Sequence, residues 1–349
     1  MIIVDIIKLL LRLFIILLIP VLIGYGTYRI MDKMFFSPIE PGNAQSVLFQ
    51  IAPGSSFKQI CAALEKQGLV KYAWSLDIIS RLKKVDKQIH AGEYELNKNM
   101  RPTDILATLV SGKIFERRVT VKEGVSVWEI GKLLEDAGLM PKSDFNAAIV
   151  DIELLHQAGI PEESKSFEGY LFPDTYAFSR PIDAKRVIWT MLKQGIDKWS
   201  DAFTARTQEL KMTRHEILTL ASIIEKESGS KIDEQPLISA VFHNRLKQGM
   251  KLQADPTTIY GIPNFDGNLT RQHLETPTPY NTYTNFGLPP GPIANAGFSA
   301  IRAALYPAES QALYFVSNNQ GGHVFSSTLE EHNKAVAVYQ QKKTPADAN

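Results

Sequence analysis

Hydrophobic residues along the chain are concentrated first in a continuous run near the N-terminus, at residues 9–28. Arg12 is the single charge in this run, and about 20 apolar residues are enough to span the hydrocarbon core of a bilayer. A cleaved signal peptide would have a shorter apolar core and a cleavage site of small residues, whereas bulky Tyr28 and Ile30 occur here. The pattern therefore predicts an uncleaved transmembrane helix at residues 9–28, preceded by a short tail at residues 1–8.

The apolar run does not show on which side of the membrane the rest of the chain lies. Lys8 and Arg12 lie at one end of the run, and Arg29 and Lys33 at the other, so the positive-inside rule is nearly balanced. The residues that follow contain no second run of this length, so we expect them to lie together on one side.

A strand–helix pattern follows residues 37–46, a stretch rich in Pro, Gly, Asn and Ser that is typical of a linker. Residues 47–70 and 118–140 align without a gap. The matching pairs include Gly54 with Gly124, Ser56 with Ser126, Ile60 with Ile130, Leu64 with Leu134 and Gly68 with Gly138. Each copy has the pattern of a short strand, a glycine turn, a serine N-cap and an amphipathic helix closed by glycine. The chain therefore contains an internal repeat of a strand–helix unit.

The segment between the two copies predicts one more strand and one more helix. Residues 89–96 alternate like a strand, and residues 101–112 have a helical pattern with Thr103 as the expected N-cap. Strand, glycine turn and capped helix together resemble the LysM fold, which in many proteins binds cell-wall glycan. The alternative is a spacer that holds the later residues away from the membrane. We assign residues 47–165 to a LysM-like repeated strand–helix module.

The most apolar helix of the remaining chain is expected to begin after Thr213. Thr213 and Glu216 have the spacing of a capping box. The next residues make most of the helix surface apolar: Ile217, Leu218, Leu220, Ala221, Ile223 and Ile224. A helix that is apolar almost all round lies inside a domain. The helix therefore carries Glu225 and Glu227 to the margin of a core before Gly229 ends it.

A carboxyl group at the margin of a core loses solvent, which raises its pKa and suits it to act as a general acid near neutral pH. The alternative is that Glu225 and Glu227 are exposed and pair with Lys226 or Lys231, an interaction of small energetic value. At about 100° per residue the two glutamates lie on opposite flanks of the apolar face, so helical geometry does not choose between them.

Loops rich in aromatic, proline and hydroxyl residues surround this helix in the sequence. They occupy residues 167–178, 251–259 and 274–288. The aromatic residues of the first loop could form a wall that stacks on sugar rings, or they could pack in the core. A long loop of this composition is usually functional or disordered, and its aromatics argue against disorder. We further expect helices at residues 182–199, 236–246 and 330–341 and a hairpin at residues 314–317 and 322–326.

Composition excludes several classes of function. The chain has 38 Lys and Arg against 37 Asp and Glu, and a net charge of +1 argues against nucleic acid as a partner. Cys61 is the single cysteine, so no internal disulfide can form, and its apolar neighbours predict a buried structural thiol. The seven histidines show no metal-ligand spacing, so neither a metal nor another cofactor is expected.

Five motifs in order resemble the YceG-like family of membrane-anchored endolytic murein transglycosylases over nearly the whole chain. They are EGYLFPDTY at 168–176, ASIIEKES at 221–228, LQADPTTIYG at 252–261, ETPTPYNTY at 275–283 and GLPPGPI at 287–293. One departure is IANAG at residues 293–297, where relatives often have a proline before the glycine.

The resemblance implies an α+β protein with an N-terminal transmembrane helix, the LysM-like α/β module, and a mostly helical, lysozyme-like catalytic domain with a small β portion at residues 166–341. A polar tail follows at residues 342–349. The implied enzyme is a carbon–oxygen lyase that cleaves the β-1,4 bond between N-acetylmuramic acid and N-acetylglucosamine and leaves a 1,6-anhydro end. Such enzymes place the catalytic Glu directly before a Ser at a helix end, which favours Glu227 over Glu225. The residues expected to hold the sugar or to orient Glu227 are Tyr170, Asp174, Gln253, Asp255, Thr257, Tyr260, Asn281 and Tyr283.

The resemblance also implies partners and a location. The partners are peptidoglycan glycan strands, the cytoplasmic membrane and, through strand synthesis, penicillin-binding synthases. The body is then expected in the periplasm, held by the inner membrane, with residues 1–8 as a cytoplasmic tail. Two alternatives remain: a muramidase-type hydrolase whose second carboxylate is Asp255 or Asp174, and a non-enzymatic glycan-binding scaffold for cell-wall synthases.

Overall fold

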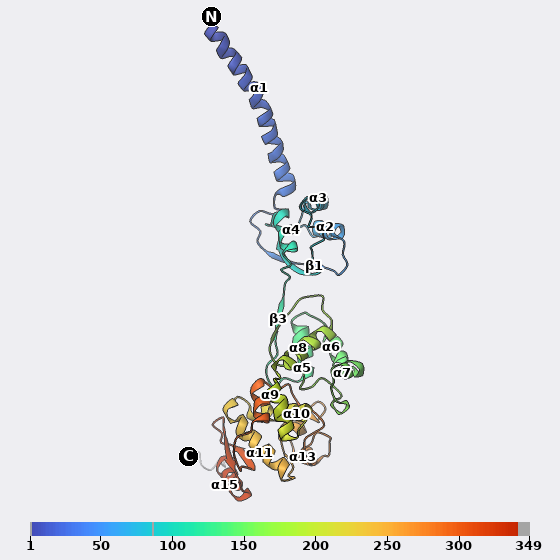
Figure 1. Cartoon of the computed structure of the whole chain (residues 1–349), viewed down its shortest axis with the longest axis vertical. Helices are drawn as coiled ribbons and strands as arrows, with labels where there is room; N and C mark the ends of the chain where they lie inside the picture. Colours follow the sequence, from blue (N-terminus) through green and yellow to red (C-terminus); the bar gives the residue numbers. More distant parts are fainter. Residues whose placement is uncertain (1, 86, 341–349) are drawn as a thin grey trace, which may run out of the picture. The chain divides into compact units, whose positions relative to one another are not determined.

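The computed structural model describes residues 2–85 and 87–340 and divides into two compact units (Figure 1). The first unit runs up to residue 117 and includes residues 178–181; the second contains residues 118–177 and the residues from 182 onward. The predicted polar tail at residues 342–349 lies outside the described residues. The division therefore falls inside residues 47–165, and the two copies of the strand–helix repeat belong to different units.

The first unit begins with the long apolar helix α1 (Ile2–Met31), followed directly by a short π-helix, η1 (Asp32–Phe36). Residues Ile6–Met31 of α1 are long and apolar enough to cross a membrane. The prediction of one apolar helix of spanning length is therefore confirmed. The helix starts before residue 9 and ends after residue 28, so the predicted N-terminal tail is helical from Ile2.

A small sheet with helices on it forms the body of the first unit. Strand β1 (Ser46–Ile51) pairs antiparallel with β2 (Gly92–Asn97), with Phe49 opposite Tyr94. The helices of this body are α2 (Phe57–Lys66), α3 (Ala73–Lys83) and α4 (Pro102–Val110). Their apolar faces share one core that includes Phe49, Leu64, Leu76, Tyr94 and Leu106. The expectation of Thr103 as an N-cap was wrong, because α4 starts at Pro102, whose missing N–H suits the first helical position, with Arg101 as the N-cap.

Both copies of the repeat have the local geometry that the sequence predicts. Gly54 and Gly124 have φ of +77° and +76°, values that favour glycine. Ser56 caps α2 in a capping box, and Ser126 caps α5 (Val127–Asp136) in the same way. These contacts depend only on residues three apart, which explains why they could be predicted. A likeness to LysM itself stays a prediction.

The second unit is mostly helical. Its elements before the central helix are β3 (Arg117–Thr120), α5, α6 (Lys142–Ala148), α7 (Ile152–Gln157), η2 (Glu162–Ser164), β4 (Thr175–Phe178), α8 (Ala184–Lys198) and α9 (Asp201–Leu210). Strand β3, whose first residue still belongs to the first unit, pairs with β4. The elements from the central helix onward are α10 (Arg214–Ser228), η3 (Ile232–Glu234), α11 (Gln235–Lys247), α12 (Asp255–Tyr260), α13 (Arg271–Glu275), α14 (Phe298–Leu305), β5 (Tyr314–Ser317), β6 (His323–Ser326) and α15 (Leu329–Tyr339).

Helix α10 lies at the centre of the second unit, where it packs against α11 and α14. The capping box of Thr213 and Glu216 starts the helix as predicted. Every residue from Ile217 to Glu225 is buried, so the expectation that this helix lies inside a domain is confirmed. The predicted hairpin β5–β6 and the helices α8, α11 and α15 are also present, with ends shifted by one or two residues. An α+β fold with a small β portion is therefore confirmed.

Candidate active site

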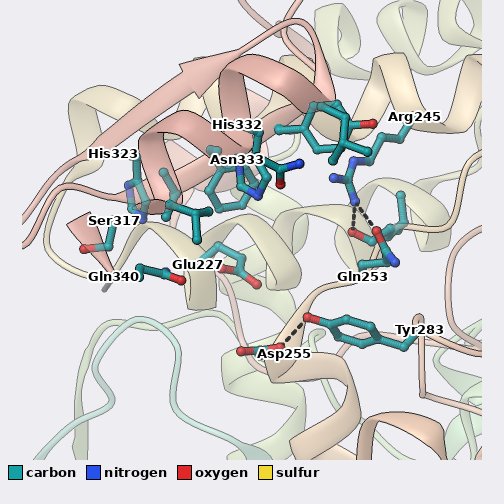
Figure 2. A pocket seen from close by; sticks show the side chains of 16 residues that line it. Glu227, Arg245, Gln253, Asp255, Tyr283, Ser317, His323, His332, Asn333 and Gln340 are labelled. Atoms are coloured by element: carbon teal, nitrogen blue, oxygen red, sulfur yellow. Dashed lines mark hydrogen bonds between the residues drawn. The ribbon is translucent and has the colours of Figure 1, made fainter. Parts of the chain in front are cut away.

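The C-terminal end of α10 forms part of a cavity of about 620 Å³ in the second unit (Figure 2). Four parts of the chain supply its other walls: Arg245 of α11, the segment from Leu252 to Asp255, Tyr283 of the loop after α13, and the group formed by β5, β6 and α15. Polar side chains from all of them surround Glu227, among them Arg245, Gln253, Asp255, Tyr283, His323, His332 and Asn333. A concave site with a few convergent polar groups is the usual form of a small-molecule or glycan site.

Glu227 is the one of the two candidate glutamates that lines this cavity. Its pKa is raised to about 8: burial is the main cause, the nearby charge of Asp255 also raises the pKa, and the guanidinium of Arg245 lowers it. A carboxyl group with this pKa is largely protonated at neutral pH, which a general acid requires.

Glu225 lies on the opposite flank of α10 and has a different environment. Its Oε2 accepts a 3.0 Å hydrogen bond from the backbone N of Gly297, just before α14. Burial is the main cause that raises its pKa. The neighbouring Lys226 donates to the carbonyl of Gly124 at 3.3 Å. The bond from Gly297 makes Glu225 a link between α10 and the start of α14, and Glu227 is the glutamate of the pair that lines the cavity.

Arg245 is a buried cation on the cavity wall that the sequence analysis did not select. It donates to the carbonyls of Leu313 at 2.7 Å and of Leu252 at 2.8 Å, and to Oε1 of Gln253 at 3.3 Å. Its guanidinium also lies over the ring of Tyr314, 5.1 Å from the centroid. Arg245 thus joins α11 to the loop before α12 and to the start of β5. Arg245 follows Val241 by four residues and Phe242 by three, so it lies on the apolar face of α11. This spacing was the signal in the sequence for a buried role.

Gln253, Asp255 and Tyr283 are the predicted substrate-binding residues that the fold brings to Glu227. Tyr283 donates a 2.6 Å hydrogen bond from its phenol to Oδ1 of Asp255. Gln253 has φ of +50°, an uncommon conformation for a residue with a side chain, and its backbone N donates to the carbonyl of Thr282. Three of the eight predicted residues therefore meet the cavity.

Thr257 and Asn281 are buried and do not line the cavity, but their hydrogen bonds support segments that do. The hydroxyl of Thr257 lies 2.8 Å from that of Thr282 and donates to the carbonyl of Ala254. The amide of Asn281 donates to the carbonyls of His273, Leu274 and Thr276, and its Oδ1 accepts from the backbone N of Tyr283. These bonds hold the long loop that carries Tyr283.

Tyr170 and Asp174 are placed away from the Glu227 cavity. Tyr170 lines a separate cavity beside the start of α10, where its phenol lies 2.7 Å from Nδ1 of His215. Nε2 of His215 donates to the carbonyl of Pro290 at 2.7 Å, so the ring joins Tyr170 to the loop before α14. Asp174 accepts from Nε2 of Gln194 at 2.6 Å.

Tyr260 contacts a buried carboxyl group, Glu168, that the sequence analysis did not select. Tyr260 donates to Oε2 of Glu168 at 3.3 Å, and Glu168 also accepts from the backbone N of Val127 and from Nδ2 of Asn295. Only 2% of Glu168 is exposed, and burial raises its pKa to about 8. Glu168 ties α5 to α12 and to the loop before α14. Its position beside the apolar Phe167 was the available sequence signal.

Two histidines complete the wall of the Glu227 cavity. Nδ1 of His323 donates to Oε2 of Glu234 at 2.7 Å, and the backbone N of His323 donates to Oε1 of the same carboxylate. His332 stacks on Tyr314 with ring centroids 5.2 Å apart. The described residues contain no cluster of three or more His, Cys, Asp or Glu side chains that could hold a metal. The side chains that line the cavity offer carboxyl, guanidinium, phenol, amide and imidazole groups.

A glutamate with a raised pKa at the end of a buried helix, facing a polar cavity, is typical of an enzyme that uses acid–base catalysis. Comparison with known proteins gives the family. The model of the YceG-like family matches residues 49–338. The chain belongs to the YceG-like family, as the sequence motifs predicted.

Characterised relatives and one solved structure agree with this assignment. A Bacillus subtilis protein named endolytic murein transglycosylase is 34% identical over 91% of both chains. A Streptococcus pneumoniae protein of the same name is 30% identical over 92% of this chain, which spans 63% of that protein. A crystal structure of a yceG-like protein from Listeria monocytogenes shares 33% identity and a TM-score of 0.58, and covers 83% of this chain and 99% of its own.

Proposed function

We propose that the chain is an endolytic lytic transglycosylase that cleaves peptidoglycan glycan strands, with Glu227 as its catalytic acid and base. The observation that carries the proposal is Glu227 at the end of α10, facing a polar cavity with its pKa raised to about 8. The relatives named endolytic murein transglycosylase support the substrate and the class of reaction. The enzyme class is a peptidoglycan lyase.

The bond and the product are those that the resemblance to the family implies, and one carboxyl group suffices for the chemistry. Protonated Glu227 gives its proton to the glycosidic oxygen that joins C1 of N-acetylmuramic acid to C4 of N-acetylglucosamine, and the bond from C1 to this oxygen breaks. The oxygen of the 6-hydroxyl of the same muramic acid then forms a bond to C1, and its proton returns to Glu227. No water is consumed, and the product ends in a 1,6-anhydro ring. A site that excludes water favours this outcome over hydrolysis.

The residues around Glu227 then have separate roles. Asp255, Gln253 and Tyr283 contact the sugar, since they line the same cavity. Thr257 and Asn281 position the loop that carries Tyr283, because their bonds end within that loop and its neighbours. Tyr170, Asp174 and Tyr260 lie outside this cavity, so their predicted contact with sugar requires a strand longer than the cavity itself.

We also propose that α1 anchors the protein in the cytoplasmic membrane, with the second unit on the outer side, where peptidoglycan lies. A periplasmic location follows from this orientation, and a role in ending strand elongation is a further proposal that rests on the cleavage of glycan strands. Glycan binding by the strand–helix module and association with penicillin-binding synthases are further proposals. The antiparallel pair of β1 and β2, with α2 and α3 between them in the chain, supports the first proposal, because it forms a compact body with its own core.

The decisive experiment is mass spectrometry of the muropeptides released from uncrosslinked glycan strands by the full-length protein. We expect anhydro ends from the wild type and a loss of at least about 100-fold for Glu227→Gln. Glu225→Gln is the matched control: it also neutralises a buried carboxyl group of α10 but keeps an acceptor for Gly297, so it should retain activity.

Each other outcome contradicts part of the proposal. Reducing ends from the wild type would indicate a two-carboxylate hydrolase and direct attention to Asp255. Anhydro ends from Glu227→Gln at the wild-type rate would mean that Glu227 is not the acid. No product from the wild type would support the non-enzymatic scaffold.

A further inference from the structure

Helix α3 of the first unit carries an exposed apolar stripe on the surface next to the end of α1. Trp74, Ile78 and Leu82 follow one another at four-residue intervals, so they lie on one face of the helix. All three are exposed, and Leu82 has 79% of its surface accessible. The opposite face of α3, with Leu76 and Ile79, packs into the core of the unit. A contiguous exposed stripe of this kind marks an interaction surface.

The stripe is continuous with the predicted membrane span. Phe35, four residues after the last residue of α1, stacks edge-on against Trp74 with ring centroids 4.9 Å apart. Tyr72 lies 6.0 Å from both rings. Phe36 packs on the core of the first unit, and Asp32 lies 4.0 Å from Arg101 of the α4 cap. These contacts tie η1, and with it the end of the span, to the body that carries α3.

The contact with Phe35 brings the stripe close to the level of the lipid headgroups. Four helical residues rise by at most roughly 6 Å, so the backbone of Phe35 lies within that distance of the end of α1, and its ring contacts Trp74. The headgroup layer on each side of a bilayer core is roughly 5–8 Å thick. Tyr25 and Tyr28 near the end of the same helix are residues typical of this layer.

The charge around the stripe also matches a lipid surface. Residues 71–84 contain Lys71, Arg81, Lys83 and Lys84 against one acid, Asp77. Asp77 is paired with Arg81 at 3.0 Å. A helix with Trp and aliphatic residues on one face, bordered by cations, is the pattern of a helix that lies in the membrane interface and favours anionic lipids.

We propose that the Trp74–Ile78–Leu82 face of α3 lies in the headgroup layer of the membrane that α1 spans, so that the first unit rests on the bilayer. The occupant of the face is a lipid surface that contains anionic headgroups. The proposal rests on the membrane anchorage proposed above. Its consequence is that the first unit cannot rotate freely about the end of α1.

The test uses a fluorescent, environment-sensitive label on full-length protein in vesicles of phosphatidylcholine and phosphatidylglycerol. Ile78→Cys places the label on the stripe, and Glu95→Cys on the exposed side of β2 is the matched control. The native Cys61 is 1% exposed and burial raises its pKa to about 12, so it does not compete for the label. Lipids that carry a nitroxide in the headgroup region then report contact by quenching.

We expect the nitroxide lipids to remove roughly half of the emission at position 78 and little at position 95. A water-exposed, unquenched label at position 78 would overturn the proposal. A label that is shielded from water but not quenched by the lipids would also overturn the proposal, because it would indicate that a protein covers the stripe. Flotation with the vesicles is measured on the same samples: protein that does not float contradicts the anchor itself, whereas floating protein with an unquenched label contradicts only the docking of α3.

Discussion

The phenol of Tyr283 donates a 2.6 Å hydrogen bond to Oδ1 of Asp255, and both side chains line the cavity that contains Glu227. Tyr283 belongs to the long loop after α13, and Asp255 is the first residue of α12. The bond therefore fixes the direction of the Asp255 carboxylate relative to Glu227. Because Asp255 is a cause of the raised pKa of Glu227, the phenol acts on the catalytic group through Asp255.

Replacement of Tyr283 by Phe should lower activity without abolishing it. A hydrogen bond to a charged group contributes about 1.5–3 kcal/mol, and exposure of Asp255 to solvent reduces this to about 1 kcal/mol. We therefore expect kcat/KM on glycan strands to fall by roughly fivefold for Tyr283→Phe. The double variant with Asp255→Asn is the control: if Tyr283 acts through Asp255, the two effects should not add. Full additivity would contradict this positioning role.

The pH dependence of cleavage should show an alkaline limb near the pKa of Glu227. The first step needs the protonated carboxyl group, and burial raises its pKa to about 8. Activity should therefore be nearly constant below this pH and fall about tenfold per pH unit above it. The charge of Asp255 raises the pKa of Glu227, so the alkaline limb of Asp255→Asn should lie at lower pH than that of the wild type. If the alkaline limb does not move, Asp255 is excluded as a cause of the raised pKa of Glu227.

Arg245 should have the opposite effect on the same profile. Its guanidinium lowers the pKa of Glu227, so Arg245→Gln should move the alkaline limb to higher pH. Arg245→Lys keeps the positive charge and should leave the limb near its wild-type position. Both variants should unfold at a lower temperature, since the bonds to Leu313 and Leu252 are lost or weakened. Profiles of kcat/KM and melting curves of the three proteins check these expectations.

The ionisation of buried Glu168 should lower the stability of the folded protein as the pH rises. Its pKa is about 8 in the folded protein and 4.5 in the unfolded reference, so folding favours the protonated form. Its contribution to stability is fully present below about pH 4.5 and is lost as the pH rises through about 8. Glu168→Gln has no such group, so its melting temperature should fall less than that of the wild type between pH 5 and pH 9.

The comparison isolates Glu168, because Glu227 titrates in both proteins. The amide oxygen that Glu168→Gln introduces remains an acceptor for the backbone N of Val127. Equal losses of melting temperature in the two proteins would contradict a buried, protonated Glu168.

Gly169 should not tolerate a side chain. Its φ is +80°, and a Cβ at this position would lie 2.2 Å from Cβ of Pro292. Gly159 is the matched control, since its φ is +68° and no atom lies within 4 Å of the added Cβ. We expect about 1–2 kcal/mol of destabilisation for Gly159→Ala from backbone strain alone, and about 1–3 kcal/mol more for Gly169→Ala from the overlap. Denaturant unfolding of both variants measures the difference.

The sequence by itself determined the features that depend on near neighbours in the chain. The apolar span, the serine and threonine caps of α2, α5 and α10, and the burial of α10 all follow from spacings of one to four residues. The repeat could be recognised for the same reason, because each copy closes its own turn and cap. The motifs were sufficient to recognise the family and to identify both glutamates as candidates.

Only the tertiary structure decided which glutamate meets the cavity. Glu225 and Glu227 lie on opposite flanks of one helix, so their environments come from whatever packs there. The backbone of Gly297, 72 residues away in the chain, donates to Glu225. Segments from Arg245 to Gln340 enclose Glu227. The roles of Arg245 and Glu168, and the burial of Thr257 and Asn281, escaped the sequence analysis for the same physical reason: desolvation and hydrogen bonding of a side chain are set by groups that only folding brings together.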